Sequence, residues 1–322
     1  MNIDHEGRDK IFVFLINAGL QQLVLLYIYS KKQLINNNMD STGQFRENLN
    51  ATADDSPLMK VREEATPFEE GTPQVIDTSH LKRDALEKRH MFAYAVGHFS
   101  NDLCAAQWFF YLVYYLKFIV GLTGGQAGFA MMSGQFADGL MTPLVGALSD
   151  RYKTRIGSRT PWYIFGTLIV LPSFFALFLG PFKPLIPSDS IPTDIYVYYL
   201  VFPAVFNIGW AAVQIANMSI VNSLTYSTQK RDQLVASRNT FTFVANISVL
   251  AFALVIFQII DEGIWQYRVL AIVVIAIGTL TSLFYLANIK EPYLSGEAKR
   301  LQKEFKLQQS GFYKEEKKQK ER

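Results

Sequence analysis

Cysteine and histidine are scarce in this sequence. It contains one cysteine, Cys104, and four scattered histidines among 322 residues. A lone cysteine excludes an intramolecular disulfide framework and a cysteine-based zinc site. The histidines lack metal-ligand spacing, and no predicted helix carries a zinc-binding histidine pair or paired catalytic carboxylates. We therefore expect neither an enzyme nor a bound cofactor or metal.

Charged side chains are also scarce over long stretches. Residues 99–149 contain few of them, whereas residues 289–322 are mostly charged or polar, and 50% of the chain is hydrophobic. This segregation is typical of membrane-spanning helices with solvated ends. We predict an all-α membrane protein that has the lipid bilayer and no nucleic acid as a partner. Residues 291–322 would form a charged cytosolic tail.

Apolar runs long enough to cross a bilayer recur within residues 91–290, and a helical span takes roughly 20 residues. Six such spans are predicted, at 93–120, 125–149, 162–182, 194–222, 239–260 and 267–288. Loops rich in lysine and arginine alternate with neutral or acidic loops along this series. By the positive-inside rule, both ends of the six-helix unit are cytosolic.

The first 90 residues differ from the rest in composition. Residues 31–90 are polar and poor in aromatic side chains, which is typical of a disordered cytosolic leader. Ahead of them, residues 11–29 are hydrophobic but interrupted by Asn17, Gln21 and Gln22. This segment is an extra spanning helix, a signal-like segment or an interfacial helix, and the sequence leaves the three open.

Two acidic residues lie deep within the first two predicted spans. At about 1.5 Å per helical residue, Asp102 lies roughly 14 Å into its span, and Asp138 lies roughly 18 Å from the cytosolic end of the next. Carboxylates inside a bilayer are costly and mark functional sites by default. We interpret both as substrate or coupling-ion groups that exchange a proton or bind a cation. The alternative is a packing role in which Asn101 or Gln135 satisfies each acid.

Further polar side chains accompany these acids. His98 lies one helical turn before Asp102, so it either relays a proton or is simply buried and hydrogen-bonded. Asn101 is a candidate ligand at the same depth. Arg238, at the start of the fifth span, extends to the interface or reaches inward to an anionic group. A stripe on the fourth span should face a cavity or another helix, and it comprises Trp210, Gln214, Asn217 and Asn222.

The second span ends in a glycine followed by charged residues. Gly146 would allow close helix approach, and Asp150 would pair with a base or a helix N-terminus across the loop. We interpret this segment as a latch that closes the cytosolic side. The latch motif also includes Arg151, Arg155 and Arg159. Arg155 and Arg159, together with Trp162, also fit a role as interfacial anchors.

The segment Gly146-Ala-Leu-Ser-Asp150-Arg151, with Arg155 after it, resembles the loop motif of the major facilitator superfamily. The flanking sequence narrows the resemblance to the glycoside–pentoside–hexuronide:cation symporter branch. Three blocks resemble a lysosomal, cysteine-transporting subgroup of that branch more closely still: YAVGHFSNDLCAAQWFFYL (94–112), GQFADGLMTPLVGALSDR (134–151) and GWAAVQIANMSI (209–220).

The resemblance implies the N-terminal six-helix half of a twelve-helix fold, built from two inverted three-helix repeats. It also implies a secondary symporter that moves a small polar solute by alternating access. Transport would then need the missing C-terminal half or a second copy of the chain. Without either, the chain would be a non-transporting six-helix scaffold.

The resemblance also assigns roles by position. It implies that Asp102 binds substrate and that Asp138 is the first acid of the cation site. The asparagine and aspartate that complete a sodium site fall on Met141 and Thr142 here, which favours proton coupling. Arg238 becomes a substrate contact, so that an amino acid such as cysteine would place its ammonium at Asp102 and its carboxylate at Arg238. A sugar or lysolipid stays an alternative substrate, in the plasma or an endolysosomal membrane.

Overall fold

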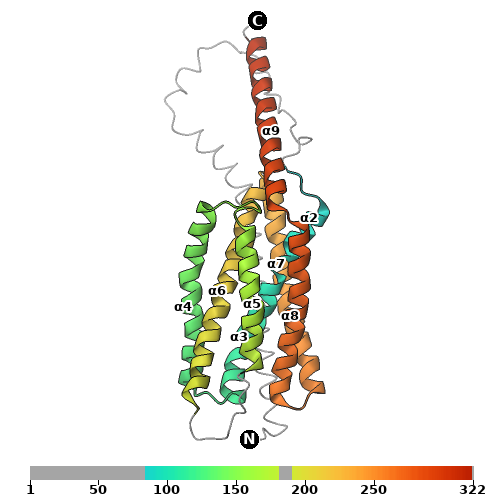
Figure 1. Ribbon diagram of the computed structural model, residues 1–322. Coiled ribbons are helices and arrows are strands. Elements are labelled where there is room, and N and C mark those ends of the chain that lie inside the picture. Colours follow the sequence, from blue (N-terminus) through green and yellow to red (C-terminus); the bar gives the residue numbers. More distant parts are fainter. Residues whose placement is uncertain (1–83, 181–190, 321–322) are drawn as a thin grey trace, which may run out of the picture. The chain divides into compact units, whose positions relative to one another are not determined.

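The computed structural model describes residues 84–180 and 191–320 of the chain, and the side chains up to residue 307 (Figure 1). The hydrophobic segment 11–29 and nearly all of the predicted leader lie outside the described residues. The chain divides into two units, and the described residues belong to the second, Leu81–Arg322. Its regular structure is helical, as predicted, and comprises α2 (Lys88–Val96), α3 (Phe99–Tyr114), η2 (Tyr115–Ile119), α4 (Gly124–Arg151), α5 (Thr160–Leu179), α6 (Thr193–Leu224), α7 (Thr228–Ile259), α8 (Gly263–Asn288) and α9 (Glu291–Lys320).

The first predicted span is divided among α2, α3 and the π-helical turn η2. The break between α2 and α3 lies at Gly97, where a Cβ atom would overlap the ring of Tyr285. The hydroxyl of Tyr163 donates a hydrogen bond of 2.6 Å to the Gly97 carbonyl at this break. Helix α2 begins at Lys88, inside the segment predicted to be disordered, and Asp84 just before it accepts a hydrogen bond from Thr225.

The other helices lie close to the predicted spans, with one large difference in α7. This helix begins at Thr228 behind the N-cap Ser227, whereas the sequence placed the span from residue 239. The charged turn and the apolar run are therefore one continuous helix, and Arg238 lies within it rather than at its start. The prediction failed because the charged residues ended the apolar run without ending the helix.

By length and composition, four of the described helices are apolar enough to cross a membrane: α5, α6, α7 and α8. Two of the six predicted spans do not meet this criterion of helix length and hydropathy. The first is broken into short pieces, as described above. The second is a single helix, α4, but glycines and polar residues such as Ser133, Gln135 and Asp138 lower its hydropathy. The polar side chains that lower the hydropathy of α4 include side chains of the candidate site.

The helices pack into neighbouring groups. Helix α6 lies against both α4 and α5, while α3 lies against α7 and α8 (Figure 1). Helices α5 and α6 cross closely, and a Cβ atom on Gly166 would lie 2.6 Å from the carbonyl oxygen of Gly209. Such small residues let helix backbones approach closely. The largest fully buried side chains between the helices are aromatic and include Trp108, Tyr94, Tyr163, Tyr267, Phe174 and Phe206.

Candidate functional site

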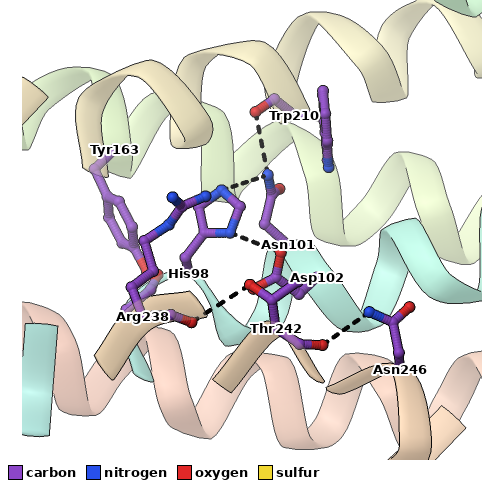
Figure 2. Close-up of polar contacts among 9 residues, drawn as sticks. His98, Asn101, Asp102, Tyr163, Trp210, Arg238, Thr242 and Asn246 are labelled. Carbon is purple, nitrogen blue, oxygen red and sulfur yellow. Dashed lines mark hydrogen bonds and ion pairs between the residues drawn. The ribbon is translucent and has the colours of Figure 1, made fainter. Parts of the chain in front are cut away.

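The carboxylate of Asp102 is the centre of a buried polar cluster between α3 and α7 (Figure 2). Its Oδ1 atom lies 2.9 Å from Nδ1 of His98, one helical turn earlier on α3. Its Oδ2 atom accepts a hydrogen bond of 3.0 Å from the Thr242 hydroxyl on α7. The acid is therefore held from two helices, and neither partner is the amide that the packing alternative proposed.

Asn101 connects this cluster to α6. Its Nδ2 atom lies 3.4 Å from Nε2 of His98 and donates a hydrogen bond of 3.4 Å to the Trp210 carbonyl. The Oδ1 atom of Asn101 is buried and has no hydrogen-bond partner among the described residues. An unsatisfied buried acceptor is costly, so this oxygen is a candidate contact for a donor that enters the site.

Arg238 lies on α7 one helical turn from Thr242, on the same face. Figure 2 shows its side chain extending from α7 toward the His98 ring. Its Nε atom is buried without a hydrogen-bond partner, and among the described residues no carboxylate lies within ion-pair distance of it. A half-buried guanidinium without a counter-ion is suited to bind an anionic group.

Asp138 lies at a different place, in a small cavity between α3, α4 and α6. The cavity has a volume of about 40 Å³, which is room for water rather than for a solute. The carboxylate is half-buried and accepts a hydrogen bond of 3.1 Å from the hydroxyl of Thr142, one turn later on α4. The cavity is lined by Ala105, Trp108, Phe109, Gln135, Asp138, Phe206, Asn207 and Trp210.

The predicted stripe on α6 divides into two parts. Trp210 lines the Asp138 cavity, and Gln214, one turn later, is half-buried with its Oε1 atom unpartnered. Asn217 is fully buried, and its backbone carbonyl accepts a hydrogen bond from Tyr94 on α2. Asn222 lies near the end of the helix, where it accepts a hydrogen bond from Arg231. Of this stripe, Trp210 thus faces the cavity, and Asn217 lies in helix packing.

Asp102 and Asp138 therefore belong to two clusters, joined through Trp210, whose carbonyl contacts the first and which lines the cavity of the second. Sequence reasoning missed Thr242, which holds Asp102, and Asn207, which lines the cavity, and it named Thr142 only as a departure from a sodium site, not as the partner of Asp138. Each of these three residues is polar and lies one helical turn from a residue already proposed for the site, and this spacing was the signal that could have found it. Among the described residues, no group of three metal-ligating side chains occurs.

The described residues give different surroundings to two members of the predicted latch. Asp150 pairs with the guanidinium of Arg159, which lies at the N-cap of α5, so the acid meets a base across the loop. At Gly146, no atom of the described residues lies within 4 Å of a Cβ placed there, so the close helix approach expected at this glycine stays a prediction. Arg151 and Arg155 are exposed, and Arg151 lies over the Tyr152 ring.

Comparison with known proteins identifies the family of the chain. A family model described as MFS/sugar transport protein matches residues 93–315. Mouse major facilitator superfamily domain-containing protein 12 is 36% identical over 222 residues, which are 63% of this chain and 46% of that protein. An uncharacterized symporter of Synechocystis is 30% identical over 66% of this chain and 41% of its own length. Mouse sodium-dependent lysophosphatidylcholine symporter 1 is 25% identical over 54% of this chain and 32% of its own.

The chain is therefore an integral, multi-pass membrane protein of the transporter class, not an enzyme. It belongs to the MFS/sugar transport protein family, whose model covers more than half of the chain. The chain spans about half the length, or less, of the relatives named above.

Proposed function

We propose that the chain is the six-helix N-terminal half of a secondary transporter that works by alternating access. The observation that carries this proposal is the buried Asp102 cluster, in which an acid is held between α3 and α7 beside an unpaired Arg238. Transporters bind solute near the bilayer midplane, at the interface between helical repeats. In this proposal α4, and α3 with its flanking turns, also cross the membrane, because their polar residues face the site.

We infer that the solute is a small zwitterion, an amino acid, with cysteine as the candidate that the sequence resemblance indicates. Asp102 retains acceptor capacity after binding His98 and Thr242, because an ionised carboxylate offers about four lone-pair sites. The ammonium of an amino acid would bind there. Its carboxylate would bind Arg238, whose guanidinium suits a planar anion. A sugar would leave both charges uncompensated.

The coupling ion in this proposal is a proton. Asp138 is the one carboxylate among the residues that line the small cavity, and its neighbour Thr142 supplies a hydroxyl where a sodium site would have a second acid. One carboxylate with neutral oxygens is a poor cage for a metal cation but a sufficient proton carrier.

The coupling ion is tested by uptake of labelled cysteine into vesicles that contain the protein expressed from its complete open reading frame. We expect uptake to continue when choline replaces sodium, and to change between about pH 5.5 and 7.5. Asp138→Asn should abolish this pH dependence. Asp232→Asn, at an exposed acid near the start of α7, should retain it. Uptake that requires sodium, or that keeps its pH dependence in Asp138→Asn, would contradict proton coupling through this acid.

A second six-helix half, in the same product or in a second copy, would complete the substrate path. Exposed apolar side chains on α4 and α7 support this, among them Phe129, Phe136, Leu140, Ile247 and Val255. Such faces suit lipid or another helix bundle. A non-transporting scaffold is the second candidate. Complete absence of uptake by the full product, with normal membrane expression, would favour it.

A further inference from the structure

The carboxylate of Glu291, the first residue of α9, is buried at the N-terminus of α5. It accepts hydrogen bonds from the backbone N–H groups of Ser158, Arg159 and Thr160 at 2.8 to 3.1 Å, and from the Thr160 hydroxyl at 2.8 Å. Only 4% of Glu291 is exposed. The first N–H groups of a helix lack intrahelical partners and carry partial positive charge. An acid 131 residues away from Thr160 satisfies them here.

The backbone beside this carboxylate is shaped to receive it. Gly157 has a φ of +117°, a conformation that residues with a side chain rarely adopt. A Cβ atom at this position would overlap the carboxyl group of Glu291. The loop between α4 and α5 therefore needs glycine here both for its conformation and for the close approach of the acid.

The carboxylate of Glu291 is connected to the latch through Arg159. Arg159 donates its backbone N–H to both oxygens of Glu291, at 3.1 and 2.9 Å. Its guanidinium pairs with Asp150 at the end of α4. The backbone position from which the Arg159 side chain extends is thus fixed by Glu291.

We propose that Glu291 is a positioning residue of the cytosolic latch. It holds the backbone of Arg159 so that the guanidinium meets Asp150, and it joins the segment after α8 to the loop between α4 and α5. Opening of the Asp150–Arg159 pair and displacement of the start of α9 are then coupled events. This inference rests on the proposed role of the loop as a latch, but its tests do not depend on transport.

The first test is hydrogen exchange of the purified full product in detergent or nanodiscs. Glu291→Gln keeps the size of the side chain but removes its charge and one acceptor oxygen. We expect the amides of Ser158, Arg159 and Thr160 to exchange about tenfold faster or more, because bonds to a charged acceptor are among the stronger ones. The matched control is Glu297→Gln, an acid on the same helix that pairs with Arg300. Unchanged exchange at the three amides would overturn the proposal.

The second test separates positioning from simple capping of α5. Trypsin cleavage after the exposed Arg155 reports local opening of the loop, because the protease needs an extended chain. Glu291→Gln and Asp150→Asn should each increase the cleavage rate. In the double variant, the fold-increase in cleavage rate should be smaller than the product of the two single fold-increases. Glu297→Gln combined with Asp150→Asn should show independent effects.

Independent effects of Glu291→Gln and Asp150→Asn would instead show that Glu291 only caps α5, and would overturn its role in the latch. A milder variant, Thr160→Val, covers the case in which Glu291→Gln fails to fold. It removes the hydroxyl donor alone. It should accelerate cleavage in the same direction by a smaller factor, and a rate equal to that of the unchanged protein would count against the proposal.

Discussion

Replacing Asp102 by asparagine is expected to lower substrate uptake about a hundredfold or more while leaving the amount of protein in the membrane unchanged. Truncating one partner of a buried charge pair costs roughly 2–5 kcal/mol, and each 1.4 kcal/mol is about tenfold. Asparagine has nearly the same volume and can still accept the hydrogen bond from Thr242. The loss should therefore come from the missing charge and not from misfolding. The measurement is uptake of labelled cysteine, normalised to surface expression.

Arg238→Gln should reduce uptake to a similar extent, because it removes the charge proposed to bind the carboxylate of the same substrate. Asp232→Asn is the control, since this acid lies on α7 but is exposed near the start of that helix. Normal transport by both Asp102→Asn and Arg238→Gln would eliminate the proposed substrate site. Equal loss in the Asp232→Asn control would point to a general effect of charge on the protein.

Gly166→Leu is expected to prevent stable folding of the helix bundle. A Cβ atom at residue 166 would lie 2.6 Å from the Gly209 carbonyl oxygen and 2.7 Å from the backbone nitrogen of Val213. Overpacking a core with side chains that can shift costs about 1–3 kcal/mol, and backbone atoms shift less readily than side chains. We expect at least about a tenfold loss of monodisperse protein after detergent extraction, measured by fluorescence-detected size-exclusion chromatography.

The control for that variant is Gly139→Leu. Gly139 is also a glycine within a helix, but no atom of the part of the chain that the structure describes lies within 4 Å of a Cβ placed there. Both substitutions improve helix propensity by about the same amount, so a difference between them isolates the α5–α6 crossing. Equal yields of the two variants would show that the crossing tolerates a side chain.

The sequence predicted the helical class and most helix positions because apolar runs and charged loops alternate along the chain. It also singled out Asp102 and Asp138, because a charge within an apolar run is conspicuous, and Arg238 through the family resemblance; the functional roles of the three stay predictions. The assembly of the site was less predictable. Thr242 and Asp102 are 140 residues apart, and a threonine inside a span carries no signal of its own.

Two structural details also lay beyond the sequence. Glu291 was assigned to a charged tail because its neighbours along the chain are polar, whereas its partners in space are backbone N–H groups of a distant loop. Conversely, Gly146 belonged to a motif that suggested close helix packing, yet its surroundings within the described residues are open. Local pattern shows which residues are unusual, and only the packing of the helices shows what they meet.

The most direct test of an Asp102–Arg238 site for a zwitterion is competition for labelled cysteine uptake by analogues that each lack one charged group. Cysteamine lacks the carboxylate, and 3-mercaptopropionate lacks the ammonium. In vesicles with the complete product, we predict that unlabelled cysteine competes strongly and that both analogues compete at least about tenfold more weakly, since each leaves one buried charge unpaired. Equal competition by either analogue, or competition by a sugar or a lysolipid in place of cysteine, would contradict recognition through this pair.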